Sequence, residues 1–223
     1  MERHSYLGKM RQNNLIERLV GKKLFWLVFS VLFFSFPLVR ALTRKLPKPL
    51  PVYSKIDQYS LTNEWGKSFG SNNLKGRVYI ANFVFTNCPT VCPKLLKKMQ
   101  KIQKRVRGLG SKIALVSFSV DPKNDTPKVL YKLSRKLQAN PHVWSFLTGS
   151  ENNIKNILLK NFKLPMQKSD NVYSFAHSQK FVLVDKNGSI RGYYSSDKDS
   201  INRLMIDVGL LVNNAFHKSP NET

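Results

Sequence analysis

Residues 77–93, RVYIANFVFTNCPTVCP, join a run of apolar side chains directly to a pair of cysteines. The run Arg77–Phe85 is rich in bulky apolar residues, as in a strand that is covered on both faces. Pro93 suits the first turn of a helix, because its missing amide would have no partner there. These residues therefore predict a buried strand, a short loop that carries Cys88 and Cys92, and a helix.

The helix that follows Pro93 is predicted to be amphipathic and to end near residues 108–110. Apolar side chains recur at three- and four-residue steps from Leu95 to Val106, and lysines occupy the positions between them. No aromatic residue interrupts the lysine face to stack on a base, and no motif of a DNA- or RNA-binding module is present. We therefore expect no nucleic-acid partner, and acidic lipid headgroups or an acidic partner protein suit this face better.

Downstream, predicted strands and helices alternate, which is typical of an α/β domain with a central mixed sheet and flanking helices. Cap and turn residues mark several boundaries, such as Thr126 before Pro127 and the Asn-Gly pair at 187–188. The predicted strands are 113–120, 143–146, 181–184 and 189–194, and the predicted helices are 126–137, 150–162 and 197–212.

The composition limits the class of protein. The chain has 223 residues, and 37 Lys and Arg against 13 Asp and Glu give a net charge of +24. An apolar content of 42% excludes disorder of the whole chain. Two cysteines cannot supply a disulfide framework, so the fold must depend on the burial of apolar surface.

A second apolar run lies near the N-terminus. Leu24–Val39 contains no charged residue and is flanked by Lys22, Lys23 and Arg40. We expect an uncleaved transmembrane anchor over 24–42 and disfavour two alternatives, a cleaved signal peptide and a buried core helix. The balanced basic flanks do not predict the topology. The predicted organisation is a basic segment (1–23), the anchor (24–42), a proline-containing linker (43–60), the folded domain (61–213) and a tail (214–223).

The position of the two cysteines predicts reactive thiols. Cys92 lies at or beside the predicted helix cap, where unpaired amides and the helix dipole favour a thiolate. With three residues between them, Cys88 and Cys92 can form a disulfide or bind one soft metal ion together. A purely structural disulfide is the alternative. A structural zinc site is not expected, because the chain has no second cysteine pair.

A third metal ligand would have to come from elsewhere in the chain, and His177 is the strongest candidate. It directly precedes a predicted buried strand, although by spacing alone such a histidine is more often a surface residue. Two thiolates and one imidazole suit Cu(I), and the imidazole also tolerates Cu(II).

Other residues that could be functional are given structural interpretations. We interpret Asp121 and Asp125 as loop and cap residues, Met166 as an apolar filler, and Trp65 and Trp144 as core residues.

Residues 61–212 resemble the Sco/SenC family of copper-delivery proteins. The resemblance rests on the order of five motifs: NLKGR (73–77), NFVFTNCPTVCP (82–93), SFSVDPKNDTP (117–127), WSFLTG (144–149) and AHSQKFVLVDKNG (176–188). It implies a thioredoxin-like domain that is tethered to the bacterial inner membrane and faces the periplasm, or, less favoured, to the mitochondrial inner membrane. It also implies that Cys88, Cys92 and His177 bind copper for the binuclear centre of cytochrome c oxidase, whose copper-bearing subunit would be the partner.

Two positions depart from the usual family pattern. Thr90 stands where many members have Asp, and Phe175–Ala176 replace Val-Asp before the histidine. Neither position is a ligand, so the implied site keeps its donors but loses acidic neighbours. The alternative function is a thiol:disulfide oxidoreductase that uses Cys88 and Cys92, so enzymatic activity stays open. A thiol peroxidase and a binder of anionic polymers are weaker alternatives.

Overall fold

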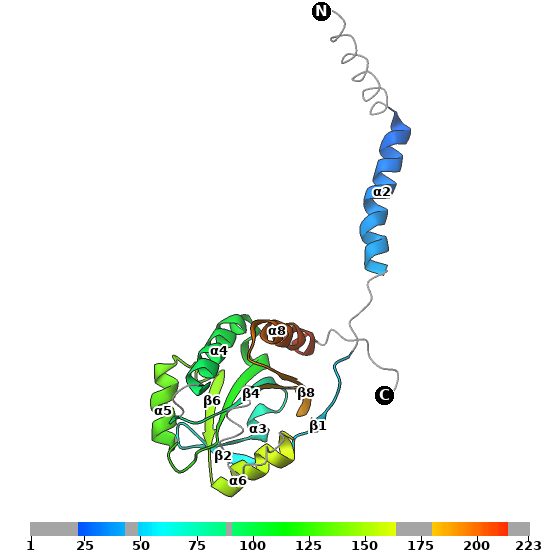
Figure 1. Cartoon of the computed structure of the whole chain (residues 1–223). Helices are drawn as coiled ribbons and strands as arrows, with labels where there is room; N and C mark the ends of the chain where they lie inside the picture. The colour runs from blue at the N-terminus through cyan, green and yellow to red at the C-terminus, as the bar shows by residue number, and fades with distance from the viewer. Residues whose placement is uncertain (1–21, 43–48, 88–90, 164–179, 214–223) are drawn as a thin grey trace, which may run out of the picture. The chain divides into compact units, whose positions relative to one another are not determined.

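The computed structural model describes residues 22–42, 49–87, 91–163 and 180–213. The chain divides into two units, Met1–Leu46 and Pro47–Thr223. The first unit contains helix α2 (Lys23–Leu42), and the second contains every other described element (Figure 1).

Helix α2 has 20 residues and covers the region for which the sequence predicts a membrane anchor. Its large apolar side chains are exposed to solvent, with Leu24 and Phe34 each 70% accessible. Across the described residues, none of the helices combines the length with the hydropathy that a membrane span requires. The helix is therefore present, and the anchor stays a prediction.

The described strands of the second unit form one eight-stranded sheet in the order β1-β8-β7-β4-β5-β6-β2-β3. The bounds are β1 (Ser54–Lys55), β2 (Ser60–Asn63), β3 (Ser68–Gly70), β4 (Val78–Val84), β5 (Ile113–Ser119), β6 (Trp144–Thr148), β7 (Phe181–Val184) and β8 (Ser189–Tyr194). The central strands β4, β5 and β6 are parallel, and the outer strands pair antiparallel to their neighbours. The sheet is therefore mixed, as the sequence predicts.

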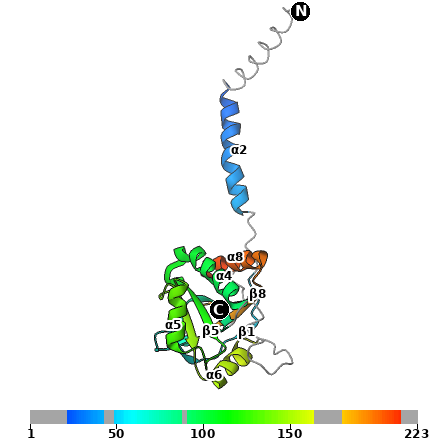
Figure 2. The ribbon, with the colours of Figure 1, turned by 60° about the vertical axis from the view of Figure 1, so that its left-hand side comes forward.

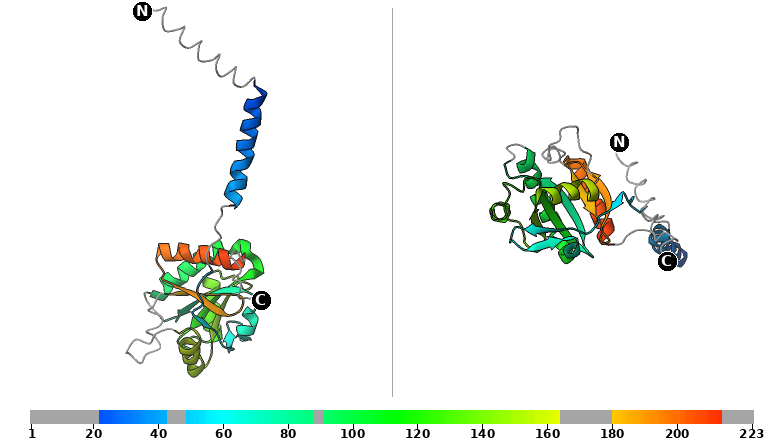
Figure 3. Two further views of the ribbon diagram at one scale, coloured as in Figure 1. Left: turned by 90° about the vertical axis from the view of Figure 1, so that its right-hand side faces the viewer. Right: turned by 90° about the horizontal axis from the view of Figure 1, so that it is seen from below.

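Helices cover both faces of this sheet. Every residue of β4 and β5 is buried, which requires a covering layer on each side. Helices α4 and α8 lie along one face and α6 lies on the opposite face (Figures 2 and 3). The helix bounds are α3 (Ser71–Leu74), α4 (Val91–Arg105), α5 (Pro127–Lys136), α6 (Glu151–Asn156) and α8 (Lys198–Val212), with a 3₁₀ helix η1 (Arg107–Lys112) and a π-helix η2 (Ile157–Asn161).

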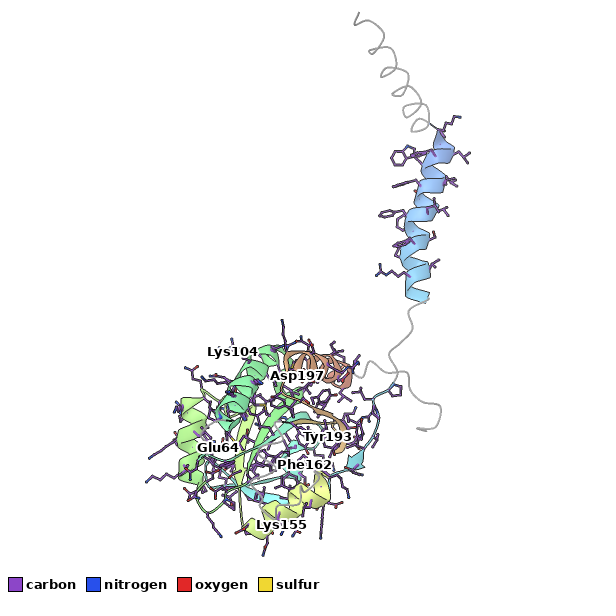
Figure 4. The ribbon with its side chains drawn as sticks, viewed as in Figure 1. Glu64, Lys104, Lys155, Phe162, Tyr193 and Asp197 are labelled. Atoms are coloured by element: carbon purple, nitrogen blue, oxygen red, sulfur yellow. The ribbon has the colours of Figure 1, made fainter. Side chains whose placement is uncertain are left out.

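Three aromatic side chains form the centre of the core on the α6 face. Phe83 of β4 and Phe118 of β5 are register partners and stack with ring centroids 5.6 Å apart. Phe162, at the end of η2, meets both rings edge-on with centroids at 5.1 Å. All three side chains are almost completely buried. The Phe162 carbonyl also accepts a hydrogen bond from the Tyr193 hydroxyl at 2.8 Å (Figure 4). This cluster packs the end of η2 against the central strands β4 and β5.

One arginine joins the starting ends of the three parallel strands. Arg77 directly precedes β4, and its Nη2 donates to the carbonyl of Ile113 at 2.6 Å and to that of His142 at 3.1 Å. These carbonyls lie at the start of β5 and just before β6. Burial lowers the pKa of Arg77, but the two hydrogen bonds offset part of the cost of burying its charge.

The sequence-based strands and helices from residue 77 onward agree with the structure to within a few residues, and Trp144 is fully buried as predicted. The prediction that Trp65 is a core residue is wrong. Its side chain is 47% exposed, because it lies at the turn between the short strand β2 and the edge strand β3 and packs edge-on against Tyr131 of α5. Strand β1 and the first residue of β2 lie within 43–60, the predicted linker, because β1 pairs with the distant strand β8 and Ser60 pairs with Gly70 of β3.

We predict that Phe162→Ala lowers the free energy of unfolding by about 3–5 kcal/mol, because it leaves a cavity against Phe83 and Phe118. Urea denaturation of the full chain measures this loss. Ile206→Ala is the matched control: this α8 side chain is 64% exposed, and its removal should change stability by less than about 0.5 kcal/mol. A loss below about 1 kcal/mol for Phe162→Ala would contradict the cluster's importance.

Candidate metal centre

Cys92 lies in the first turn of α4, which begins at Val91, two residues earlier than the sequence predicts. Its side chain is 1% exposed and belongs to the hydrophobic core. The first amides of an α-helix have no carbonyl partners within the helix, and together with the helix dipole they favour negative charge beside them. The structure therefore presents one sulfur donor at the end of a helix that follows the central strand β4.

The other two predicted ligands, Cys88 and His177, lie outside the described residues, and so does Met166. Within 22–42, 49–87, 91–163 and 180–213, no three His, Cys, Asp or Glu side chains converge as a metal site would require. The predicted ligand set of Cys88, Cys92 and His177 consequently stays a prediction.

The register of the sheet indicates how the chain approaches this end of β4. In the antiparallel pair of β4 and β7, Ala81 lies opposite Val182. Strand β7 therefore begins, at Phe181, near the edge of the sheet where β4 ends. Strand β7 therefore enters the sheet at the same edge at which β4 leaves it.

A buried carboxylate fastens the end of β4. Asp125, fully buried in the loop between β5 and α5, accepts hydrogen bonds from the Thr86 amide at 3.2 Å and from the Thr86 hydroxyl. It also accepts one from the Ser119 hydroxyl at 2.5 Å. Thr86 lies two residues before Cys88, so these contacts fix the point from which the cysteine loop leaves the sheet.

The sequence analysis missed this function of Asp125. It assigned both acidic residues of this loop to turn and cap chemistry, and the structure confirms this for Asp121. The Asp121 carbonyl accepts from the Asp125 amide at 2.8 Å, and its carboxylate accepts from the Asn124 side chain at 2.8 Å. Asp125 instead bonds to a residue 39 positions away. No local pattern signals such a contact, which depends on the parallel pairing of β4 and β5.

Burial raises the pKa of Asp125 above its ordinary value, and its hydrogen bonds from Ser119 and Thr86 act in the opposite direction. A second buried carboxyl behaves in the same way. Glu64, just after β2, accepts a hydrogen bond from the Phe146 amide at 2.9 Å, and burial raises its pKa. Both groups serve as fixed acceptors for the backbone.

A family model described as SCO1/SenC matches residues 49–209 of this chain. The chain belongs to this family. The SCO1/SenC match covers all the strands of the sheet, the segment with both cysteines and the segment with His177.

Individual relatives agree with this assignment. The Bacillus subtilis protein named SCO1 protein homolog is 34% identical over 146 residues, which are 65% of this chain and 76% of the relative. A Stutzerimonas stutzeri protein whose name describes it as copper-binding is 31% identical over 148 residues, 65% of this chain and 71% of the relative.

A solved structure supports the fold. BsSco, described as a member of the Sco family of cytochrome c oxidase assembly proteins with a disulfide switch, is 31% identical. It superimposes with a TM-score of 0.64 over 76% of this chain and 98% of BsSco. The predicted thioredoxin-like α/β domain of the Sco family is thereby confirmed.

We predict that Asp125→Asn changes how stability depends on pH. Because the pKa of Asp125 is raised by folding, its contribution to stability is full below about pH 4 and is lost as the pH rises through the raised value. The unfolding free energy of the wild type should therefore fall relative to that of Asp125→Asn as the pH rises from about 4 to about 7. Urea denaturation across this range measures the difference.

Asp197→Asn provides a control of opposite sign. Asp197 caps α8 and is exposed, and its hydrogen bond from the Ser200 amide lowers its pKa. Its contribution to stability is present above about pH 4 and is lost as the pH falls through the lowered value. If the difference in unfolding free energy between wild type and variant changed with pH in the same direction for both variants, the raised pKa of Asp125 would be wrong.

Proposed function

We propose that this chain is a copper metallochaperone of cytochrome c oxidase assembly, which binds copper through Cys88, Cys92 and His177. The observation that carries the proposal is the position of Cys92, buried in the first turn of α4 at the edge of the sheet where β7 begins. The Stutzerimonas stutzeri relative named as copper-binding and the oxidase-assembly role described for BsSco support the metal and the process.

The donor set fits copper as cargo. Two thiolates and one imidazole form a soft, low-coordinate site that suits Cu(I) and tolerates Cu(II). A site with few ligands leaves room for donors of a receiving protein, so copper can pass by ligand exchange without leaving a coordinated state. The recipient would be the copper-bearing subunit of cytochrome c oxidase.

We expect the variants Cys88→Ser, Cys92→Ser and His177→Ala each to weaken copper binding by at least about tenfold, because each removes one donor. Competition of the reduced full chain against a chromophoric Cu(I) chelator measures the affinity.

His142→Ala is the matched control for His177→Ala. His142 is exposed in the turn before β6 and is held through its backbone, because its amide donates to the Asn140 side chain and its carbonyl accepts from Arg77. This variant should bind copper as the wild type does. If His177→Ala retained full affinity, the three-ligand site would be wrong, even if both cysteine variants lost copper.

A second candidate function is thiol:disulfide exchange with a partner protein through Cys88 and Cys92. The observation that favours it is the disulfide switch described for BsSco. In this function the thiolate attacks a partner disulfide, and the second cysteine then resolves the mixed disulfide, leaving the partner reduced and this chain oxidised. His177 separates the two functions, because copper binding needs its imidazole and disulfide exchange does not.

We also propose that α2 attaches the domain to the bacterial inner membrane, with the domain on the periplasmic side. The support is the exposure of its apolar side chains over a segment with no internal charge between Leu24 and Val39. In water this surface is unfavourable, and a lipid environment would cover it.

Deletion of residues 23–42 should move the protein from the membrane fraction to the soluble fraction of expressing cells. Immunoblotting of both fractions after a carbonate wash measures this distribution. Phe162→Ala, which damages the core and leaves α2 intact, should stay with the membrane. Recovery of the deletion variant in the membrane fraction would overturn the attachment.

A further inference from the structure

Helix α4 carries a continuous stripe of positive charge on its outer face. The buried face packs into the core through apolar side chains such as Leu95, Met99 and Ile102. The cations recur at three- and four-residue steps on the other side: Lys94, Lys97, Lys98, Lys101, Lys104 and Arg105.

No carboxylate balances this stripe. The sequence has no Asp or Glu between Glu64 and Asp121. In the part of the chain that the structure describes, the salt bridges are Lys123 with Glu151 and Arg191 with Asp185, and neither involves α4. The stripe therefore keeps its full charge at the surface.

The arrangement does not help α4 to form. Like charges at spacings of three and four residues repel one another along a helix, and Lys94 in the first turn opposes the helix dipole, whereas Lys104 and Arg105 in the last turn suit it. Lysines alternating with glutamates would keep the helix soluble and stabilise it. A uniform stripe that works against the helix is best explained by an external anionic partner.

A groove lies beside this stripe, between α4 and α8. Its volume is about 490 Å³, and the half-buried Ile201 contributes apolar surface to it, whereas Ile102 beneath it is fully buried. Four cations line it, Lys98, Lys101, Arg105 and Lys198, together with one carboxylate, Asp197. That carboxylate is used within the fold, because it caps α8 through the Ser200 amide at 2.8 Å. Figure 4 labels Lys104 on α4 and Asp197 at the start of α8.

Two of these cations are held in place by neutral groups. The Lys98 ammonium donates to the Ser196 hydroxyl at 3.0 Å, and the Arg105 guanidinium donates to the side-chain Oδ1 of Asn202 at 3.1 Å. The first bond reaches the residue before the N-cap of α8, and the second reaches α8 itself. They position the two cations at the groove without cancelling their charge, so less side-chain freedom is lost when an anion binds.

We propose that the groove between α4 and α8 is a docking site for an acidic protein segment, with carboxylates that meet the cations and apolar side chains that fill the groove. A concave site with apolar surface suits a protruding helix or loop, whereas a lipid bilayer presents a broad surface that would meet the stripe and leave the groove unfilled. Cys92 lies in the first turn of the same helix, so we assign the acidic segment to the protein that receives copper, an assignment that rests on the proposed function.

The test uses the full chain in micelles of a neutral detergent. The probe is a fluorescent synthetic helical peptide with leucines on one face and glutamates flanking them, and its control is the same peptide with glutamines. Fluorescence anisotropy measures the dissociation constants. Lys101→Glu together with Arg105→Glu should weaken binding of the acidic peptide by at least about tenfold, and added salt should weaken binding to the wild type.

Lys132→Glu together with Lys136→Glu is the matched control, because it makes the same charge change on exposed positions of α5 away from the groove. This α5 double variant should change the affinity for the acidic peptide by less than about twofold. Lys101→Glu alone is the second variant, since Lys101 makes no bond to α8 and its replacement should leave the fold intact.

Three results would overturn the docking site. The first is an equal loss of peptide affinity in the α4 and α5 double variants, and the second is equal binding of the glutamate and glutamine peptides. The third is displacement of the peptide by phosphatidylglycerol added to the micelles. The last result would assign the groove to anionic lipid. Cys92→Ser should bind the peptide normally and lose copper, so failure of docking and failure of copper binding are distinguishable.

Discussion

The hydrogen bonds from Thr86 and Ser119 to the Asp125 carboxylate hold together the edge of the sheet on which the proposed chemistry depends. They join the end of β4 to the end of β5 and to the loop before α5. Without this acceptor, the buried Ser119 hydroxyl and the half-buried Thr86 amide and hydroxyl would lose the carboxylate to which they donate, and an unsatisfied buried donor costs about 1–3 kcal/mol. The residue two positions before Cys88 is thus held at a fixed point beside the sheet.

Local patterns were sufficient to predict most of the domain. Strands β4 and β5 are uniformly apolar, α4 and α5 have clear helical periodicity, and the β7–β8 hairpin turns at an Asn-Gly pair, so their sequences specify them without knowledge of the rest. Strands β1 to β3 could not be predicted in this way. They are two to four residues long and exist because β8 and β6, more than eighty residues away, offer open edges.

The candidate site, likewise, could be predicted from local sequence only in part. The position of Cys92 at the start of a helix follows from neighbouring residues and was predicted to within a turn. The acceptors that support the site depend on tertiary contacts: Asp125 reaches Thr86 across 39 positions, and Glu64 reaches the Phe146 amide across 82. The sequence around a loop carboxylate is the same whether the carboxylate caps a helix or is buried as an acceptor. Only the pairing of the strands distinguishes these two roles.

Arg77 has a further consequence for how this scaffold tolerates change. Its guanidinium joins the carbonyls of Ile113 and His142 at the rim of the sheet opposite the cysteines. Both bonds leave from one nitrogen, Nη2, and a guanidinium is more weakly hydrated than the ammonium of lysine, so arginine is the cation that costs less to bury at this position. The two ends of the parallel strands are thus held by different side chains, Arg77 where the strands begin and Asp125 where β4 and β5 end.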